Sequence, residues 1–295
     1  MLSHIDSSSD VEHSPNKKIK KNVSFFPYNF INLEEQEFEL YNPNLKLFEL
    51  KMMQFYPFGS DFFTINHGKN YFLFFKRLGS VRYFIVQHID EKVIVGTACA
   101  ILRSYKVDDK KFNFWYLCDM KIDTEHRKQN LTRALFKNMF YKFSNISSSG
   151  YMISMDPGSQ QLVHIFKNIL PQQQSLTKLL IYSLTVDKMK TIEKYFVTIF
   201  KNISYLSLAG KKDLILKSTN MPLEIYHMQH GNDFIPNAKN LNEVPLTASI
   251  MFCIPSNSQI ESVLREANIT TDISATVISW SMDFFDWHSI LTSDI

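Results

Sequence analysis

Positive charge gathers in the segment EHRKQNLTR, residues 125–133, which joins an apolar run to an amphipathic run. The first N–H groups of a helix have no intrahelical partner, and the helix dipole adds positive potential at the same end. Amides and cations in this arrangement bind phosphate, so the segment predicts a pyrophosphate site. The alternative is an ordinary basic helix start with Asn130 as its N-cap. The side chains that supply the charge are His126, Arg127, Lys128 and Arg133.

The runs on either side of this segment predict the elements that position it. Residues 112–122 (FNFWYLCDMKI) predict a buried strand, and residues 131–143 place apolar side chains at helical spacing. Two earlier strands, 82–88 and 93–102, are joined by short polar turns, which predicts an antiparallel meander. The apolar stripe of the helix consists of Leu131, Ala134, Leu135, Met139, Phe140 and Phe143.

Further elements are predicted on both sides of this unit. Residues 151–155 predict a strand and 160–169 a helix, so 112–122 is expected to pair with 151–155 in parallel through a crossover. An earlier helix is predicted from Leu45 to Phe55, and the aromatic run NYFLFFK at 70–76 predicts core packing.

The polar run QQQS, residues 172–175, marks the best internal boundary. It predicts one domain over 25–171 and a second α/β domain over 175–295, whose alternation of strands and helices echoes the first. Residues 1–24 are polar and rich in Ser, which predicts a disordered tail. The run KKIKK in this tail is either a solvated segment or a localisation or phosphate patch.

Composition narrows the class of protein. The chain has 295 residues, is 45% hydrophobic and carries a formal charge of +3, which argues against a nucleic-acid-binding protein covered in Lys and Arg. Cys99, Cys118 and Cys253 stand among apolar residues, which predicts buried thiols in a reducing compartment. With no apolar signal core and no membrane-length apolar run, we expect a cytoplasmic protein that binds neither nucleic acid nor membrane. Secretion without a signal peptide stays open.

The central segment resembles motif A of the GNAT superfamily of acyl-CoA-dependent N-acyltransferases. The family's pattern is Arg or Gln, two residues, Gly, one residue, then Gly or Ala, and here it falls on Arg127, Asn130 and Thr132. Gly96 in VIVGTACAIL matches a preceding strand of the family, and Ile122 takes the place of its strand-ending Val.

Residues 159–167 (SQQLVHIFK) resemble a later helix of the family. The resemblance as a whole covers about residues 65–170. It implies an α/β fold with a mixed, mostly antiparallel sheet flanked by helices. A second, smaller α/β domain follows, and its element order leaves open a degenerate copy of the same fold.

The resemblance implies that the chain binds acetyl-CoA or another acyl-CoA, and no metal is implied. The residues that would hold the cofactor are Met120, Lys121, Ile122, Arg127, Lys128, Gln129, Asn130, Leu131, Thr132, Ser159 and Phe166.

The family's chemistry is direct transfer, in which a neutral amine attacks the thioester while strand amides near Met120 and Lys121 polarise its carbonyl. Asp119 is the candidate base, and its alternative is a strand-end carboxylate paired with Lys or Arg. Tyr116 and His164 are weaker acid–base candidates, whose alternatives are a packed aromatic ring and a helix-surface histidine.

Four positions depart from the family pattern. Asn130 and Thr132 replace the two glycines, Cys118 stands where a base carboxylate is common, and Phe166 replaces a Tyr that often protonates the leaving thiolate. Two hypotheses follow. One is an N-acyltransferase, most simply an N-acetyltransferase, acting on a primary amine of a small molecule or protein. The other is a catalytically degenerate acyl-CoA-sensing or protein-interaction module. The oligomeric state stays open.

Overall fold

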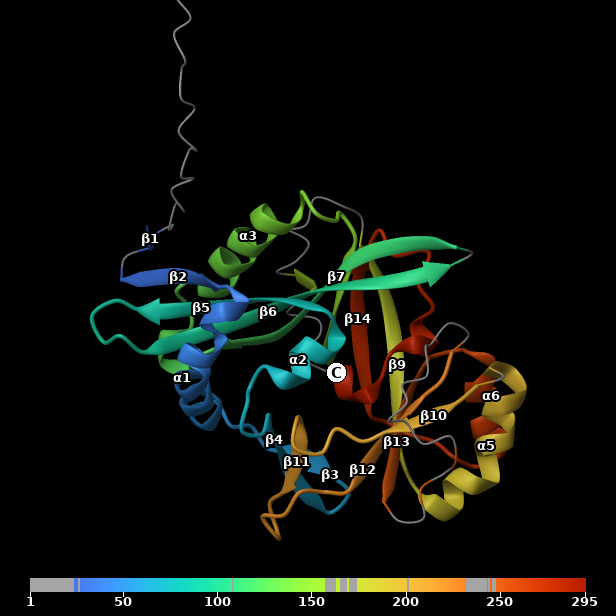
Figure 1. The fold of residues 1–295 in the computed structure, drawn as a ribbon. Helices are drawn as coiled ribbons and strands as arrows, with labels where there is room; N and C mark the ends of the chain where they lie inside the picture. Colours follow the sequence, from blue (N-terminus) through green and yellow to red (C-terminus); the bar gives the residue numbers. More distant parts are fainter. Residues whose placement is uncertain are drawn as a thin grey trace, which may run out of the picture.

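The computed structural model describes most of the chain (Figure 1). The predicted tail, 1–24, lies outside the described residues apart from Ser24, and the predicted helix 160–169 does so apart from 163–164 and 169. The described residues are 24–25, 27–107, 109–156, 163–164, 169, 174–200, 202–231, 243, 245 and 248–295.

One mixed sheet of eleven strands dominates the described part of the chain. In spatial order the strands are β1 (Ser24–Phe25), β2 (Tyr28–Leu33), β5 (Ser80–His88), β6 (Ile94–Val107), β7 (Lys110–Ile122), β8 (Gly150–Met155), β14 (Ser274–Trp280), β9 (Gln174–Thr185), β13 (Ser249–Pro255), β12 (Ile225–Gln229) and β10 (Ser204–Leu206). Most neighbouring strands are antiparallel, and the parallel pairs are β7 with β8 and β12 with β13.

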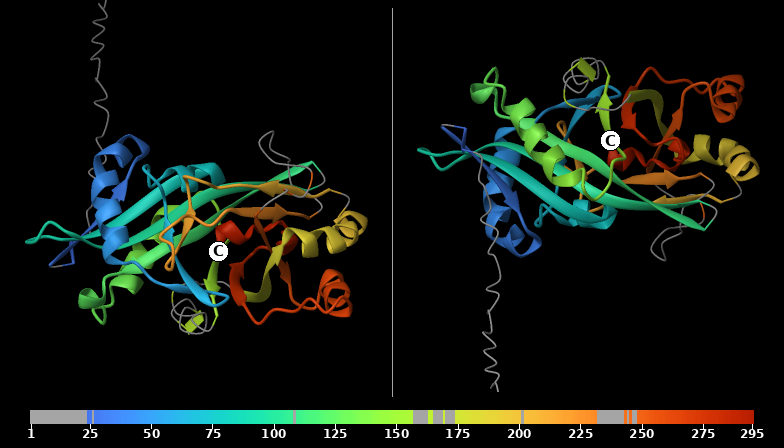
Figure 2. Two further views of the ribbon diagram at one scale, coloured as in Figure 1. Left: turned by 90° about the horizontal axis from the view of Figure 1, so that it is seen from below. Right: turned by 90° about the horizontal axis from the view of Figure 1, so that it is seen from above.

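Helices cover both faces of this sheet. On one face lie α3 (Leu131–Phe143), over the first half, and α5 (Val186–Phe200) and α6 (Gln259–Glu266), over the second half. On the other face lie α1 (Phe38–Lys51) and α2 (Leu73–Leu78), with the segment that ends at Ile295. Figure 1 shows α3 above β5–β7 with α1 and α2 below them, and Figure 2 shows α5 and α6 together at the far end.

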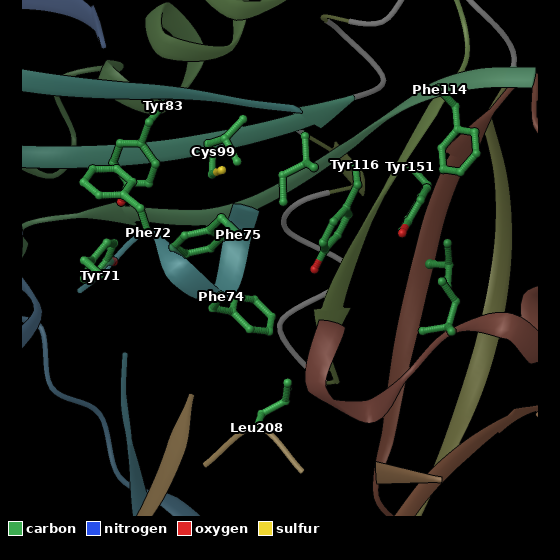
Figure 3. Packing of buried hydrophobic residues seen from close by; sticks show 14 of the residues in the cluster. Tyr71, Phe72, Phe74, Phe75, Tyr83, Cys99, Phe114, Tyr116, Tyr151 and Leu208 are labelled. Atoms are coloured by element: carbon green, nitrogen blue, oxygen red, sulfur yellow. The ribbon is translucent and has the colours of Figure 1, made fainter. Parts of the chain in front are cut away.

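The core below the sheet is mainly aromatic. Rings from α2 and its approach pack beneath β5–β8, and Figure 3 shows Phe74, Phe75 and Tyr116 converging there. The dense aromatic run at 70–76 is therefore core, as predicted from the sequence, because Tyr71, Phe72, Phe74 and Phe75 are all buried.

The antiparallel meander is confirmed, since β5 pairs with β6 and β6 with β7. The helix at 131–143 and the parallel pairing of β7 with β8 are also as predicted. The sheet is mostly antiparallel and flanked by helices, and its strand–helix–strand unit has the order that the resemblance implied.

Other predictions need correction. The helix predicted from Leu45 to Phe55 is α1, which starts at Phe38 and ends at Lys51, and Phe55 is 51% exposed. The apolar spacing continues past Lys51, although the helix ends there and the chain turns toward the next strand, β3 (Tyr56–Phe58). The closing strand–helix–strand unit is present as β13, α6 and β14, but β9 lies between its two strands.

The two halves of the chain share their sheets. Strand β14 inserts between β8 and β9, so a strand of the C-terminal half pairs with one of the N-terminal half. A small second sheet joins β11 (Asp213–Leu216) to β4 (Asp61–Asn66) and β3 (Tyr56–Phe58). The division at 172–175 therefore stays a prediction about folding units, because pairing crosses it. No helix in the described ranges is long and apolar enough to span a bilayer.

Four short 3-10 helices complete the described elements. They are η1 (Glu35–Glu37), η2 (Thr124–His126), η3 (Trp287–Ser289) and η4 (Thr292–Asp294).

Gly150 is needed where β8 enters between two strands that carry tryptophans. A Cβ there would lie 2.4 Å from Trp280 Cζ2 and 2.7 Å from the carbonyl O of Trp115. We predict that Gly150→Ala lowers the free energy of unfolding by about 1–3 kcal/mol, the usual range for overpacking. Urea denaturation measures it, with Ser148→Ala on the exposed loop before β8 as the control. Equal stability of the two variants would contradict the packing argument.

Candidate functional site

A cavity of about 590 Å³ passes through the sheet where β7 and β8 separate. The two strands pair only from Trp115 to Leu117, after which β8 continues against β14 and leaves β7. Side chains from both faces line the opening: Phe136 and Met139 belong to the α3 face, and Phe74 and Phe75 to the other face. The cavity therefore connects the two faces of the sheet.

A β-bulge in β7 lies at the wall of this cavity. Thr97 pairs with Lys121 and Cys99 with Cys118, so β7 has one residue more than β6 in this interval. Asp119 has a φ of +51°, and the Thr97 hydroxyl donates to its carbonyl O at 3.0 Å. A bulge leaves backbone groups outside the ladder. Amides of this part of β7 can therefore serve a ligand.

The side chain of Asp119 lies in a dense hydrogen-bonded cluster. Its carboxylate accepts from the hydroxyls of Tyr71 at 2.7 Å and Tyr83 at 2.5 Å, and it forms an ion pair with Lys121 at 2.5 Å. Burial raises the pKa of Asp119, but the charge of Lys121 and these hydrogen bonds outweigh it and hold the pKa below its usual value. Burial likewise lowers the pKa of Lys121, and Asp119 more than reverses this.

The pairing of Asp119 with Lys121 is the alternative that the sequence had left open for this carboxylate. A carboxylate whose pKa is lowered and whose oxygens already accept from three donors is a weak general base. This leaves Asp119 better suited to fixing the charge of Lys121 than to removing a proton from substrate.

His67 lies in the same cavity, and sequence analysis missed it. Its Nδ1 is hydrogen-bonded to the carboxylate of Glu49, which also pairs with Lys46. Burial lowers the pKa of His67, although Glu49 and Asp119 partly oppose this, so its ring is neutral at pH 7. Because a carboxylate only accepts, Nδ1 carries the hydrogen and Nε2 keeps a lone pair. No spacing pattern links Glu49 and His67, since α1 and the loop after β4 meet only in the fold.

Tyr116 lies deeper in the cavity, beside the segment that ends the described chain. Its hydroxyl donates to the carbonyl O of Asp294, and burial raises its pKa well above the usual range. Asp294 pairs with Arg77 at 2.8 Å and Arg103 at 3.3 Å. Lys212, whose pKa burial lowers to about 8, donates to the backbone O atoms of Ser293 and Ile295 at 2.6 and 3.0 Å.

A second hollow, of about 330 Å³, lies at the start of α3. Arg127 lines both hollows, and its Nε donates to the carbonyl O of Ile122 at 3.2 Å, which fixes the guanidinium near the end of β7. Asn130 has a φ of +58° in the left-handed region and makes no side-chain capping bond. It thus adopts a conformation that glycine, the family's residue here, favours. Asn130 therefore does not cap the helix with its side chain, which was the alternative interpretation of this segment.

The structure divides the predicted site residues between the two hollows. His164 lies in the hollow at α3, apart from Asp119 and Tyr116 in the cavity, so the three acid–base candidates are not brought together. Gln129 is exposed and lines neither, and Ser159 and Phe166 lie outside the described residues. The predicted cofactor residues in the cavity are Met120, Lys121, Ile122, Arg127 and Thr132, and those in the hollow are Ile122, Arg127, Lys128, Asn130, Leu131 and Thr132.

One group of side chains in the described ranges has metal-ligand spacing. Asp123, Glu125 and His126 bring ligand atoms within 4.8 Å of one another. The Lys51 ammonium already lies 2.5 Å from Asp123 and 3.0 Å from Glu125, and the Tyr28 hydroxyl contacts His126 Nδ1 at 3.0 Å. The positive charge that these carboxylates need is therefore supplied by the protein itself.

No protein-family model matches the chain. The uncharacterized protein L340 of Acanthamoeba polyphaga mimivirus is 34% identical to it over 282 residues, which cover 93% of this chain and 83% of that protein. Among solved structures, Saccharomyces cerevisiae N-myristoyltransferase with bound myristoyl-CoA is similar over 92% of this chain and 82% of its own, at 11% identity and a TM-score of 0.46. Arabidopsis thaliana NAA60 in complex with acetyl-CoA is similar over 54% of this chain and 88% of its own, at 11% identity and a TM-score of 0.35.

We predict that Asp119→Asn lowers the free energy of unfolding at pH 7 by about 3 kcal/mol, because it strands the Lys121 cation beside two buried hydroxyls. Urea denaturation measures the loss. Asp109→Asn is the matched control, since Asp109 forms an exposed ion pair with Lys106, and exposed pairs contribute little.

The same pair of variants has a defined pH dependence. The lowered pKa of Asp119 contributes stability above the unfolded-state pKa, about 3.9, and that stability is lost as the pH falls through the folded-state pKa. The gap between wild type and Asp119→Asn should therefore narrow below about pH 4. A gap that is constant down to pH 2, or an equal loss in Asp109→Asn, would rule out the buried ion pair as the cause.

Proposed function

The chain belongs to the same family as protein L340 of Acanthamoeba polyphaga mimivirus, and from its own site we propose that it is an acyl-CoA-dependent N-acyltransferase that acts on a primary amine. The observation that carries the proposal is the cavity through the sheet. One end lies at the basic start of α3, and the other lies beside a neutral histidine. An acyl donor and an amine acceptor can therefore meet from opposite faces.

The start of α3 supports binding of the CoA pyrophosphate. Free amides and the helix dipole favour an anion there, and Arg127, Lys128 and Arg133 line the hollow around it. Thr132 stands where the family has Gly or Ala, and its half-buried hydroxyl lines both hollows and can donate to a phosphate oxygen. His164 in this hollow suits a phosphate contact better than proton transfer at the acyl carbon.

The bulge in β7 supports the transfer step. We place the thioester in the gap between β7 and β8, where backbone amides near Met120 and Lys121 can donate to its carbonyl oxygen. These donors would stabilise the oxyanion that forms when the amine attacks the carbonyl carbon. The C–S bond then breaks, the amide product forms, and CoA leaves as a thiol.

His67 is our candidate for the base. Its Nε2 lone pair would take the proton that the attacking amine loses, and the proton would then pass to the departing CoA thiolate. Glu49 fixes the ring and the tautomer through Nδ1. Asp119 would act indirectly, because it keeps Lys121 charged at the cavity wall.

The proposal also specifies which acyl donor and which acceptor amine should be tested. We propose acetyl-CoA as the first donor to test, with longer acyl-CoAs beside it, and a cytoplasmic small amine or protein amine as acceptor. A thiol-release assay over an amine panel distinguishes the hypotheses. Turnover supports the enzyme, binding without turnover supports the degenerate sensing or interaction module, and no binding at millimolar acyl-CoA overturns both.

That second candidate is favoured by one observation. The Asp119 carboxylate, which the family resemblance would make a base, is committed to Tyr71, Tyr83 and Lys121. If His67 does not act as the base, the described residues in the cavity offer no other neutral imidazole.

We predict that Arg127→Ala weakens acyl-CoA binding on the order of tenfold, because a charged hydrogen bond to phosphate contributes about 1.5–3 kcal/mol. Isothermal titration calorimetry at fixed salt measures the dissociation constant. Lys137→Ala is the matched control, since Lys137 is an exposed cation on α3 that lines neither hollow. Equal weakening in both variants would indicate general electrostatic attraction and refute a specific phosphate contact.

We predict that His67→Gln lowers kcat about 100-fold, within the usual range for loss of a general base, while the dissociation constant for acyl-CoA stays within about twofold. The remaining activity should rise with pH as more of the acceptor amine becomes neutral. His88→Gln, in β5 outside the cavity, is the matched control. A kcat that is unchanged in His67→Gln would remove His67 from the mechanism.

A further inference from the structure

Two of the three cysteines face each other next to the bulge, although they are far apart in sequence. Cys99 on β6 and Cys118 on β7 are direct partners in the antiparallel ladder. Directly opposite residues of an antiparallel pair project to the same face of the sheet. The two sulfur atoms therefore lie together on the face that carries α2.

The backbone spacing suits a bond between these sulfurs. Opposite Cα atoms in an antiparallel ladder lie about 4.5 or 5.5 Å apart, depending on the type of pair. Both values fall within the range of about 4.4–6.8 Å that disulfides span. A disulfide between Cys99 and Cys118 thus needs rotation of side chains and little movement of the strands.

The two thiols differ sharply in access. Cys118 is partly exposed and lines the through-sheet cavity, whereas Cys99 is 0% exposed. Burial raises the pKa of Cys99, so Cys99 is mostly the unreactive thiol. A reagent that enters the cavity therefore meets Cys118 first and reaches Cys99 only through it.

We propose that Cys118 and Cys99 form a reversible dithiol–disulfide couple, in which Cys118 is the entry thiol for small disulfide compounds and Cys99 is the resolving thiol. The proposal assigns a modification site to the cavity wall. Its oxidant is a low-molecular-weight disulfide small enough to enter the cavity of about 590 Å³.

The exchange balances in two steps. The Cys118 thiolate attacks one sulfur of the small disulfide, that S–S bond breaks, one small thiol leaves, and a mixed disulfide forms. Cys99 then attacks the Cys118 sulfur, gives its proton to the second departing thiolate, and closes the cross-strand disulfide. Two protein thiols are oxidised and one small disulfide is reduced to two thiols.

The position of the couple gives it a consequence for the cavity. Cys118 immediately precedes Asp119, whose backbone forms the bulge. Cys99 is the residue of β6 at which pairing with β7 resumes after the bulge. A disulfide would link β6 and β7 covalently, beside the backbone amides that we propose as hydrogen-bond donors to the thioester carbonyl. This consequence for acyl transfer rests on the proposed function, whereas the exchange chemistry does not.

The test uses the full chain and oxidised glutathione as the probe. We expect wild type to lose two thiols, to gain no glutathionyl group, and to give a peptide in which residues 99 and 118 are cross-linked, all reversed by dithiothreitol. Intact mass and non-reducing peptide mapping measure this. Cys253→Ser is the matched control and should behave as wild type, because Cys253 is buried elsewhere and donates to the carbonyl O of Ile290.

Single variants separate the two roles. Cys99→Ser and Cys99→Ala should both accumulate a stable mixed disulfide at Cys118, and Cys118→Ser should leave Cys99 unmodified. Two variants at position 99 keep the test valid if one folds poorly. A mixed disulfide that persists at Cys118 in wild type, or modification of Cys99 in Cys118→Ser, overturns the proposal.

A further experiment, protection of Cys118 by acetyl-CoA, distinguishes failure of this proposal from failure of the proposed function. Saturating acetyl-CoA should slow exchange at Cys118 if it fills the cavity. Lack of protection, with the cross-link still formed, counts against acyl-CoA binding and leaves the dithiol couple intact.

Discussion

The separation of β7 from β8 is the constraint on which the site depends. A continuous sheet would leave no passage between its faces, because neighbouring strands lie only about 4.8 Å apart. Here β8 pairs with β14 along its whole length but with β7 over only three residues, Gly150 to Met152. The cavity opens where the two strands part, and side chains of both hydrophobic clusters reach it there, Tyr116 from one and Phe136 from the other.

Each acidic side chain among the described residues that line the cavity forms an ion pair with at least one basic side chain. Asp119 pairs with Lys121, Glu49 pairs with Lys46, and Asp294 pairs with Arg77 and Arg103, while Glu49 also accepts a hydrogen bond from the neutral ring of His67. Buried charges cost several kcal/mol each when they are unpaired, so each pair keeps a polar wall folded in a largely apolar setting. Within the described residues of the cavity, Nε2 of the neutral His67 ring can accept a proton without disturbing these ion pairs.

The sequence predicted the elements with strong local signals and missed features that arise only from tertiary contacts. The meander, the helix at 131–143 and the parallel strand were predictable, because apolar periodicity and polar turns are local. Asn130 takes a left-handed conformation, which the short polar side chain of Asn tolerates better than most others. By contrast, the Glu49–His67 contact, the Cys99–Cys118 pairing and the insertion of β14 join segments with no shared spacing, and no local pattern encodes them.

The insertion of β14 has a consequence for how the protein is made. This strand is synthesised after every other strand of the large sheet, yet it alone joins the strands on the β8 side to those on the β9 side. During synthesis, each part of the sheet therefore waits with an open edge, the kind of edge that invites pairing with other chains. Closure requires contacts between distant parts of the sequence, which slows folding. A nascent chain of this topology has reason to depend on chaperones until residues 274–280 emerge from the ribosome.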